Sequence, residues 1–335
     1  MTDGLRLQEL FEGAELAQFT KENRVNNAEK LKREYWRETP QERRETLMPF
    51  LWTRIAKEGQ IFGNRKRGSD AFVTNGFNFS YPGYNESLTG IADPRVDSND
   101  KRPNPNVTVL EWLNGKRAFR GSVAAFGMWD TFPFIFNVQR AGFPVNAGFD
   151  AFTALAGNSR VEMLNRLKSI SPRYWEEGPF DYLPFETAME YMKRKKPRVL
   201  YLSLGETDDW AHEGNYPQYL DAARRVDRFL REIWETAQSI GEYRGVTTLV
   251  FSPDHGRGEG AEWRSHGQRL PDYKYIWMGF LGPDTKPLGE RSNAPAVTQG
   301  QLAATVAALL GEDYHATVPQ SAPPIADVLS SAKAK

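Results

Sequence analysis

Three of the four histidines in this sequence stand close to acidic residues, in two short segments. In the first segment Asp254 and His255 are neighbours, and His266 follows eleven residues later. In the second, Asp208 and His212 have the spacing D-x-x-x-H. Imidazole nitrogens and carboxylate oxygens can bind Zn²⁺ or a similar ion and leave one position open for water or substrate. The joint placement predicts a metal site, although any one histidine alone is more often an ordinary hydrogen-bonding residue.

Glycines dominate the segment GRGEG, residues 256–260, which follows a predicted strand. A phosphate-binding glycine loop opens a helix, whereas acidic, aromatic and polar residues come next here. The spacing also differs from that of the dinucleotide fingerprint and the P-loop. We therefore expect these glycines to let the backbone wrap closely around a metal site.

A candidate nucleophile, Ser80, lies in the segment NFSYPGYNESLTG, residues 78–90. It comes just ahead of Pro82 and Gly83, and a Pro-Gly turn can present one side chain at a strand end with little freedom to move. A serine in such a loop is ordinarily solvated, so its role depends on the neighbours that the fold gives it. A free hydroxyl is a poor nucleophile, whereas one bound to a metal ionises near neutral pH.

Short apolar runs come before these polar segments and indicate buried parallel strands. The clearest runs are 199–206, 246–252 and 275–282, and an amphipathic helical pattern fills 216–241 between the first two. A strand-helix-strand unit favours an α/β fold with a doubly wound, mostly parallel sheet and helices on both faces. In such sheets reactive side chains gather past the carboxyl ends of strands, which is where both histidine segments stand.

Further helices are predicted over 40–59, 181–196 and 298–314. No internal repeat and no low-complexity linker divides the chain. We therefore expect residues 1–335 to form a single domain, with a loop-rich insertion around 81–135.

The charge balance and the absence of cysteine narrow the possible functions. The chain has 335 residues, of which 43 are basic and 43 acidic. Such a balance gives no overall field that favours nucleic acid or an anionic membrane, so an anionic substrate needs a local site. Without cysteine, any metal has to be held by Asp, Glu or His. No apolar run is long enough to span a membrane, and the chain start lacks the pattern of a signal peptide.

In combination these segments resemble the alkaline phosphatase superfamily of metal-dependent phosphoesterases and sulfatases, nearest to its nucleotide pyrophosphatase/phosphodiesterase-like branch. Two segments are similar to the family's metal-ligand motifs: DHGRG followed by HG matches its paired signature, and DDWAH matches its D-x-x-x-H. TDGLR is similar to its first metal-ligand segment, and SYPGYNESLTG is similar to its nucleophile segment. ATVAALLG, near the end of the chain, is similar to the helix that closes the fold. The resemblance implies an alkaline-phosphatase-like α/β fold that hydrolyses a small-molecule phosphate ester. It also implies two divalent metal ions, with Zn²⁺ favoured and Mn²⁺ as the alternative.

Carried over residue by residue, the resemblance implies two metal sites and a phosphoserine intermediate on Ser80. The implied ligands are Asp208, His212 and His266 for one ion, and Asp3, Asp254 and His255 for the other, with the Ser80 oxygen as a further ligand. Ser80 is expected to attack phosphorus in line, and water is expected to release phosphate afterwards. Asn104 is implied to contact a phosphoryl oxygen, with Asn106 or Asn99 as alternatives.

Asp3 departs from the family pattern, because a buried strand of about five residues should precede it and only Met1 and Thr2 do. Either the first strand is missing from this sequence, or the match at TDGLR is accidental, and the agreement of Asp3, Gly4 and Arg6 with the family segment favours the first. A lost start would take any export signal with it, so the resemblance favours an extracytoplasmic (periplasmic or secreted) enzyme. Tyr84 stands where the sulfatase signature has arginine. The alternatives are a truncated or degenerate non-catalytic member that binds an anionic ligand, and a sulfatase, phosphonate hydrolase or mutase on the same scaffold.

Overall fold

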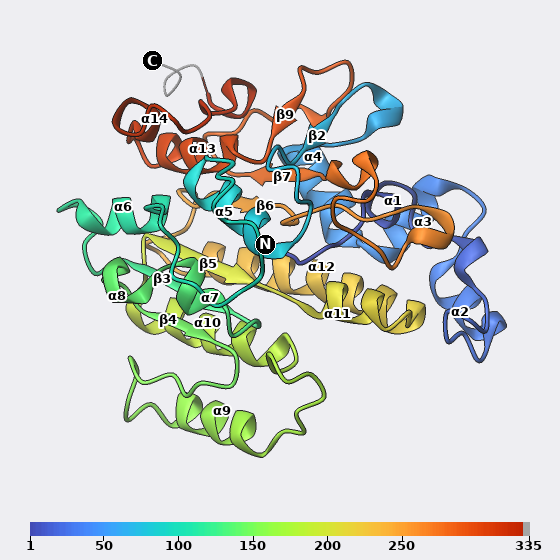
Figure 1. Cartoon of the computed structure of the whole chain (residues 1–335), viewed down its shortest axis with the longest axis horizontal. Helices are drawn as coiled ribbons and strands as arrows, with labels where there is room; N and C mark the ends of the chain where they lie inside the picture. The colour runs from blue at the N-terminus through green and yellow to red at the C-terminus, as the bar shows by residue number, and fades with distance from the viewer. Residues whose placement is uncertain (331–335) are drawn as a thin grey trace.

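Three β-sheets lie at the centre of the computed structural model, which describes residues 1–330 (Figure 1). The strands are β1 (Gln60–Phe62), β2 (Ala71–Phe72), β3 (Val123–Gly127), β4 (Val145–Ala147), β5 (Val199–Ser203), β6 (Leu249–Phe251), β7 (Met278–Leu281), β8 (Gly289–Glu290) and β9 (Val297–Thr298). The strand orders are β6-β7-β1-β8, β4-β3-β5 and β2-β9. All of these strands are short, so the sheets depend on the helices packed against them.

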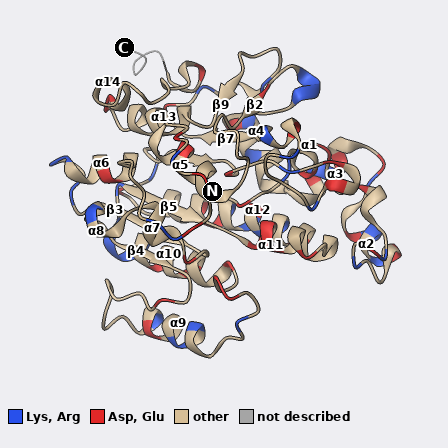
Figure 2. Ribbon diagram, in the orientation of Figure 1, with Lys and Arg blue, Asp and Glu red and all other residues tan. Residues whose placement is uncertain are grey.

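Helices flank the sheets on both sides (Figure 1). The α-helices are α1 (Leu7–Glu12), α2 (Ala28–Tyr35), α3 (Pro40–Leu47), α4 (Ala56–Glu58), α5 (Ser80–Thr89), α6 (Val109–Gly115), α7 (Phe132–Ile135), α8 (Val138–Ala141), α9 (Ser159–Ile170), α10 (Tyr182–Lys195), α11 (Glu206–His212), α12 (Tyr216–Ser239), α13 (Gln301–Leu309) and α14 (Tyr314–Thr317). Within residues 1–330, no helix is long and apolar enough to cross a membrane. Acidic and basic residues both occur on α2, α3 and α9, in keeping with the balanced charge of the chain (Figure 2).

The two faces of β5 belong to different hydrophobic clusters. Successive side chains of a strand point to opposite faces of the sheet. Val199 and Tyr201 pack against the cluster that includes residues of α5 and α13. Leu200 and Leu202 pack against the cluster that includes residues of α10 and α12. This alternation places helices on both faces of β5, as the sequence predicts for an α/β fold.

The chain start joins the two larger sheets. Thr2 forms parallel bridges both with Leu204, just past the end of β5, and with Pro253, just past the end of β6. β5 pairs with β3 in parallel, whereas β6 pairs with β7 antiparallel. Because both bridges of Thr2 are parallel, β5, the chain start and β6 run in the same direction, and their carboxyl ends lie at one edge.

The predicted strands and helices are present, with shorter bounds. The prediction that 246–252 and 275–282 form parallel strands is wrong for their mutual pairing, because β6 and β7 pair antiparallel and an apolar run does not encode strand direction. β5, β6 and β7 lie inside the three predicted ranges, and α12 fills the connection between the first two. The helix predicted over 40–59 is divided. Its first part, α3, ends before Pro49, which has no backbone N–H for the helical ladder, and a π-helix over Leu51–Ile55 and then α4 follow.

The segment that begins at Ser80 forms helix α5, where the sequence suggested a Pro-Gly turn. Pro82 lies in the first turn of α5, where the missing N–H removes no helical hydrogen bond. Within 81–135, the range expected to be loop-rich, residues 90–108 contain no helix or strand, and α6, β3 and α7 follow. Ser80 consequently stands at the N-terminus of a helix.

Candidate metal centre

Helix α11 presents the D-x-x-x-H pair. The helix starts two residues after Leu204, so its side chains lie past the carboxyl end of β5. Residues four apart share one face of a helix, and Asp208 Oδ2 lies 3.0 Å from His212 Nε2. The Asp208 side chain is mostly buried, whereas that of His212 is 51% exposed. The pair therefore forms the open side of the site.

The loop after β6 supplies Asp254 and His255, both fully buried. Asp254 Oδ1 accepts hydrogen bonds from the backbone N–H groups of Gly4 and His255, each at 3.0 Å. Asp3 lies beside them because Thr2 pairs with the ends of β5 and β6, and Asp3 Oδ2 accepts a hydrogen bond from the Tyr84 hydroxyl at 3.0 Å. Backbone pairing at the chain start thus fixes one carboxylate next to another.

His266 comes from the far end of the same loop. Its Nδ1 lies 3.2 Å from the Asn78 carbonyl, to which Gly267 N–H also donates at 2.9 Å. Its Nε2 lies 2.9 Å from His212 Nε2. These contacts attach the loop to the segment just ahead of Ser80.

The predicted metal ligands come together around His255. Its Nε2 lies 3.2 Å from Asp3 Oδ1, 3.6 Å from Asp254 Oδ2 and 3.7 Å from Asp208 Oδ1. Two overlapping groups have ligand atoms within 4.8 Å of one another, namely Asp208 with His255 and His266, and Asp3 with Asp254 and His255. His255 therefore lies between the two sites that the sequence separates, and His212 reaches the first of them through His266.

Two buried carboxylate oxygens test whether a cation fits. Within residues 1–330, neither Asp3 Oδ1 nor Asp254 Oδ2 accepts a hydrogen bond. Burial, and next the adjacent Asp3 carboxylate, raise the pKa of Asp254 well above its usual value. Two adjacent buried carboxylates are costly, and His255 is the one positively charged partner that both of these oxygens share. A divalent cation between them would compensate more of their charge. The residues present therefore fit a metal ion.

The three histidines differ in protonation. Burial by itself lowers the pKa of His255, but the carboxylates of Asp254 and Asp3 outweigh it and raise this pKa to about 9. Burial, followed by the positive charge of His255, lowers the pKa of His212 and that of His266. His212 and His266 are therefore neutral near pH 7 and ready to act as ligands, whereas His255 has to lose a proton first.

Arg257 is a charged residue of the site that sequence reasoning missed. Its guanidinium is buried, hydrogen-bonds Asp208 Oδ1 and donates to the Arg264 carbonyl at 2.5 Å. Burial is the main reason that its pKa is lowered to about 9. Its only sequence signal was its place within DHGRG, a segment that the sequence analysis interpreted through its glycines. Arg257 sets the orientation of the Asp208 carboxylate.

Ser80, the first residue of α5, is buried beside the carboxylates. Its Oγ lies 3.5 Å from His255 Nε2. The N-terminus of a helix has unpaired N–H groups and a partial positive charge, which favour an anionic oxygen. Gly83 allows this close approach, because a Cβ at that position would lie 2.2 Å from the Asp254 carbonyl oxygen.

Asn104 does not reach this cluster. Its side-chain amide donates to Asn85 Oδ1 at 3.2 Å and to the Ile135 carbonyl at 3.1 Å, and its oxygen accepts from Asn106 N–H at 2.9 Å. Asn104 is thus a buried support of the loop. Asn99 instead contacts the residue that follows the serine, since its Oδ1 accepts from the backbone N–H of Tyr81 at 2.9 Å. Spacing along an irregular loop could not distinguish between the two.

Two of the three glycines of DHGRGEG, Gly256 and Gly258, pack against backbone atoms rather than against the ligand atoms, and Gly260 has no atom within 4 Å of its Cβ position. A Cβ on Gly256 would lie 2.2 Å from the Tyr275 carbonyl oxygen, and one on Gly258 would lie 2.3 Å from that of Glu262. Gly4, by contrast, faces the cluster, because its Cβ would lie 2.7 Å from Asp208 Oδ1. The aromatic residues near the motifs pack the loops. They are Tyr81, Tyr84, Trp210 and Trp263, all buried.

An α/β fold with carboxylates and imidazoles gathered beside a serine, at the carboxyl ends of its strands, defines a metal-dependent phosphoester hydrolase of the alkaline phosphatase superfamily. A family model described as type I phosphodiesterase / nucleotide pyrophosphatase matches residues 17–273. The chain therefore belongs to the type I phosphodiesterase / nucleotide pyrophosphatase family. No curated protein matches the sequence.

Solved structures share this fold at low sequence identity. The alkaline phosphatase PafA is 12% identical, with a TM-score of 0.63 and 98% of each chain covered. The murine ectonucleotide pyrophosphatase / phosphodiesterase 5 is 12% identical, with a TM-score of 0.56 and 98% of each chain covered. The phosphonate monoester hydrolase of Agrobacterium radiobacter is 14% identical, with a TM-score of 0.53, and the match covers 79% of this chain and 69% of that one. These likenesses confirm the predicted fold.

Proposed function

We propose that the chain hydrolyses small-molecule phosphate esters with two divalent metal ions and with Ser80 as the nucleophile. The observation that carries the proposal is the position of the Ser80 hydroxyl, buried at the start of α5 and 3.5 Å from His255 Nε2 in the middle of the carboxylate and imidazole cluster. A serine in solvent has no group nearby that could stabilise its alkoxide. In this cluster both candidate ligand groups are adjacent to it.

Two sets of ligands would hold the ions. Asp208, His212 and His266 would hold one, and Asp3, Asp254 and His255 the other. The mixture of oxygen and nitrogen ligands favours Zn²⁺, with Mn²⁺ as the alternative. When bound, the ions supply charge that lowers the pKa of a bound hydroxyl and neutralises phosphoryl oxygens.

Each group of the site has its own role in the two steps of the reaction. The Ser80 oxygen attacks phosphorus and the bond between phosphorus and the ester oxygen breaks. The alcohol leaves with the proton that the serine gives up, and a phosphoserine forms. Water cleaves the serine-phosphorus bond in the second step and restores the hydroxyl. The N-terminus of α5 stabilises negative charge on the serine oxygen. Asn99 takes the role suggested for Asn104, since its oxygen is held by Tyr81 N–H and its amide N–H₂ is left to donate to a phosphoryl oxygen.

The resemblance also supports a location outside the cytoplasm, either in the periplasm or as a secreted enzyme. Fractionation of the native host, followed by immunodetection, tests this assignment. Recovery of the protein in the cytoplasmic fraction alone would contradict it.

Turnover of chromogenic phosphate esters tests the mechanism. We expect hydrolysis of a monoester or a diester that stops on chelation and returns with Zn²⁺ or Mn²⁺, together with about two ions per chain in metal analysis. Ser80→Ala should lower kcat at least about 1,000-fold, because the covalent step is lost. Ser87→Ala is the matched control, since Ser87 lies on the same helix and donates to the Tyr84 carbonyl at 2.9 Å. Full activity of Ser80→Ala would rule out the nucleophile, and phosphate binding without turnover would favour the non-catalytic alternative.

A further inference from the structure

Helix α11 begins without a capping side chain of its own. The residue before it is Gly205, and the first N–H groups of an α-helix have no partner within the helix. The carboxylate of Asp181 supplies acceptors instead: Oδ1 accepts from the Gly205 N–H at 2.7 Å, and Oδ2 accepts from the Glu206 N–H at 3.1 Å. Asp181 stands just ahead of α10, but its side chain does not cap that helix. It caps α11.

Glu206, the first residue of α11, completes a reciprocal pair with Asp181. Its Oε1 accepts from the Asp181 N–H at 2.8 Å. Its other carboxylate oxygen accepts from the Trp210 indole N–H at 3.3 Å and from the guanidinium of Arg225 on α12. Asp181 is 3% exposed and Glu206 is 1% exposed. Because buried carboxylates are costly, apolar packing would hold this end of α11 at a lower cost, and the pair adds directional hydrogen bonds.

The two faces of α11 have different surroundings. Residues four apart share a helix face, so Glu206 and Trp210 lie on one face, and Asp208 and His212 lie on the roughly opposite face. The first face is buried, whereas the second carries ligands of the candidate metal centre. A rotation of α11 by about 20° would move an atom roughly 5 Å from the helix axis by about 2 Å, which is the length of a Zn–N bond. Small rotations of α11 thus decide whether Asp208 and His212 can share an ion.

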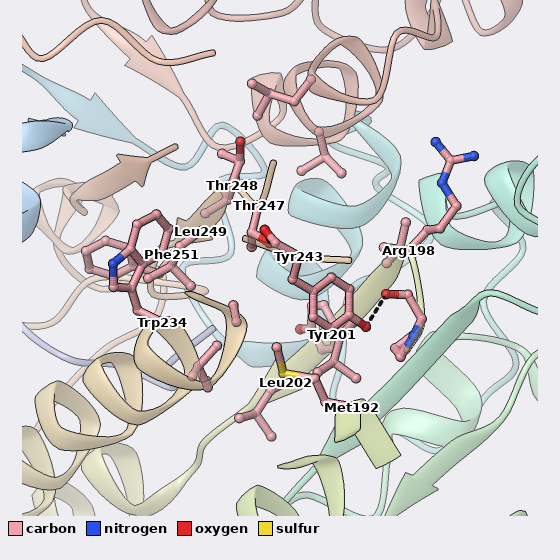
Figure 3. Close-up of a pocket in the computed structure, with 18 of the residues that line it drawn as sticks. Met192, Arg198, Tyr201, Leu202, Trp234, Tyr243, Thr247, Thr248, Leu249 and Phe251 are labelled. Atoms are coloured by element: carbon pink, nitrogen blue, oxygen red, sulfur yellow. Dashed lines mark hydrogen bonds between the residues drawn. The ribbon is translucent and has the colours of Figure 1, made fainter. Parts of the chain in front are cut away.

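Apolar packing does not fix this rotation. β5 and α12, which precede and follow α11, border an apolar cavity of about 820 Å³ with Leu202, Trp234 and Leu249 among its lining residues (Figure 3). Apolar contacts have no preferred direction, whereas hydrogen bonds weaken steeply when they are misaligned. The Thr207 hydroxyl adds one hydrogen bond, to the Asp3 carbonyl at 2.5 Å. Polar contacts of the first turn, most of them from the Asp181 and Glu206 pair, therefore hold α11 at one angle.

We propose that Asp181 and Glu206 are positioning residues of the phosphoester hydrolase, which fix the angle of α11 and through it the positions of Asp208 and His212. This inference rests on the proposed function, because there these two side chains bind one of the ions. Neither Asp181 nor Glu206 belongs to the ligand groups, so each acts through the helix. Loss of such a supporting contact lowers metal affinity about 10- to 100-fold.

Asp227, on α12, offers a matched control. Its carboxylate is 2% exposed and also accepts from two successive backbone N–H groups, those of Phe50 at 2.9 Å and Leu51 at 2.8 Å. It lies two positions beyond Arg225, so it points to the other side of α12, away from α11. Asp181→Asn and Asp227→Asn therefore disturb the same kind of hydrogen bond, one beside the candidate metal centre and one away from it.

Zinc titration of the full chain tests the proposal. Asp181→Asn should weaken the binding of one Zn²⁺ ion at least about tenfold. Asp227→Asn should leave Zn²⁺ affinity unchanged, although both variants should lower the Tm by several degrees. Glu206→Gln keeps an acceptor for the Asp181 N–H and is the second variant: if Asp181→Asn does not fold, Glu206→Gln should still weaken Zn²⁺ binding. Wild-type affinity in the Asp181 or Glu206 variant, or equal losses in Asp181→Asn and Asp227→Asn, would overturn the proposal.

Histidine NMR spectra in chelator give a second readout, which needs neither metal nor turnover. The rings of His212 and His266 lie 4.9 Å apart between centroids, so the wild-type chain should show a nuclear Overhauser effect between them. Asp181→Asn should remove this effect and shift the His212 resonances, whereas Asp227→Asn should preserve both. Unchanged His212 signals in Asp181→Asn would also overturn the proposal. A wild-type chain that binds no Zn²⁺ would contradict the proposed function, and the histidine spectra would then decide this inference by themselves.

Discussion

The protonation of His255 links metal binding to pH. Its pKa of about 9 means that the metal-free protein carries a proton on this ring at pH 7, and a ligating imidazole has to be neutral. Metal binding should therefore release at least one proton, and affinity should rise up to about tenfold per pH unit between pH 7 and 9. Calorimetry in buffers of different ionisation enthalpy measures this release. His315→Ala should leave it unchanged, because His315 contacts Ser321 and lies outside the cluster. A heat independent of buffer would contradict the prediction.

Gly4 occupies a position at the site that has no room for a side chain. Its φ is +52°, and a Cβ would lie 2.7 Å from both Asp208 Oδ1 and Arg257 Nε. Gly4→Ala should displace the Asp208 carboxylate and weaken metal binding at least about tenfold, as loss of a supporting contact at a metal site does. Gly121→Ala is the control, with φ +74° and no atom within 4 Å, so it should cost about 1 kcal/mol of stability and no metal affinity. Equal metal affinities in the two variants would contradict the prediction, because they would show that the added Cβ at Gly4 does not disturb the Asp208 carboxylate.

At the scale of elements, the contact between α5 and the β6 loop positions Ser80. Gly83→Ala adds a Cβ 2.2 Å from the Asp254 carbonyl oxygen, so α5 has to move outward. We expect a loss of stability although alanine favours helices, and a fall in kcat of about tenfold or more, because small misplacements of a nucleophile are costly. Gly115→Ala, in α6 with no atom within 4 Å, should be neutral or slightly stabilising. Denaturant unfolding and steady-state kinetics of both variants test this, and unchanged kcat in Gly83→Ala would contradict it.

At the scale of the whole molecule, the candidate metal ligands lie where the two larger sheets meet. Asp208 follows β5, Asp254 follows β6, and Asp3 stands between them. Bound ions would thus add a connection between the sheets to the pairing of the chain start and to the hydrophobic cluster that residues of both sheets contact. Metal at 100 times its Kd should add about 2.7 kcal/mol to the free energy of unfolding, which raises the Tm by several degrees. Calorimetric scans over a series of metal concentrations measure the shift. A Tm that ignores added metal and chelator would argue against a site at this junction.

The local pattern of the sequence carried much of the fold and most of the candidate site. Apolar runs located β5, β6 and β7, and helical periodicity located α12, because strand and helix periods are written in consecutive residues. Asp208 with His212, and Asp254 with His255, stood at strand ends for the same reason. The loop glycines and the Ser80 turn were less predictable, because α5 and its contacts depend on distant segments.

The amino-acid sequence by itself determined which side chains are available for catalysis and the α/β order of the elements that present them. Only the tertiary structure decided that His255 belongs to both ligand groups, that Arg257 contacts Asp208, and that Asn99 accepts a hydrogen bond from the Tyr81 N–H, next in sequence to Ser80. It also decided that the chain start bridges the ends of β5 and β6. The physical reason is distance along the chain: these contacts join segments separated by tens to hundreds of residues, whose approach is set by packing and strand pairing and not by local propensity.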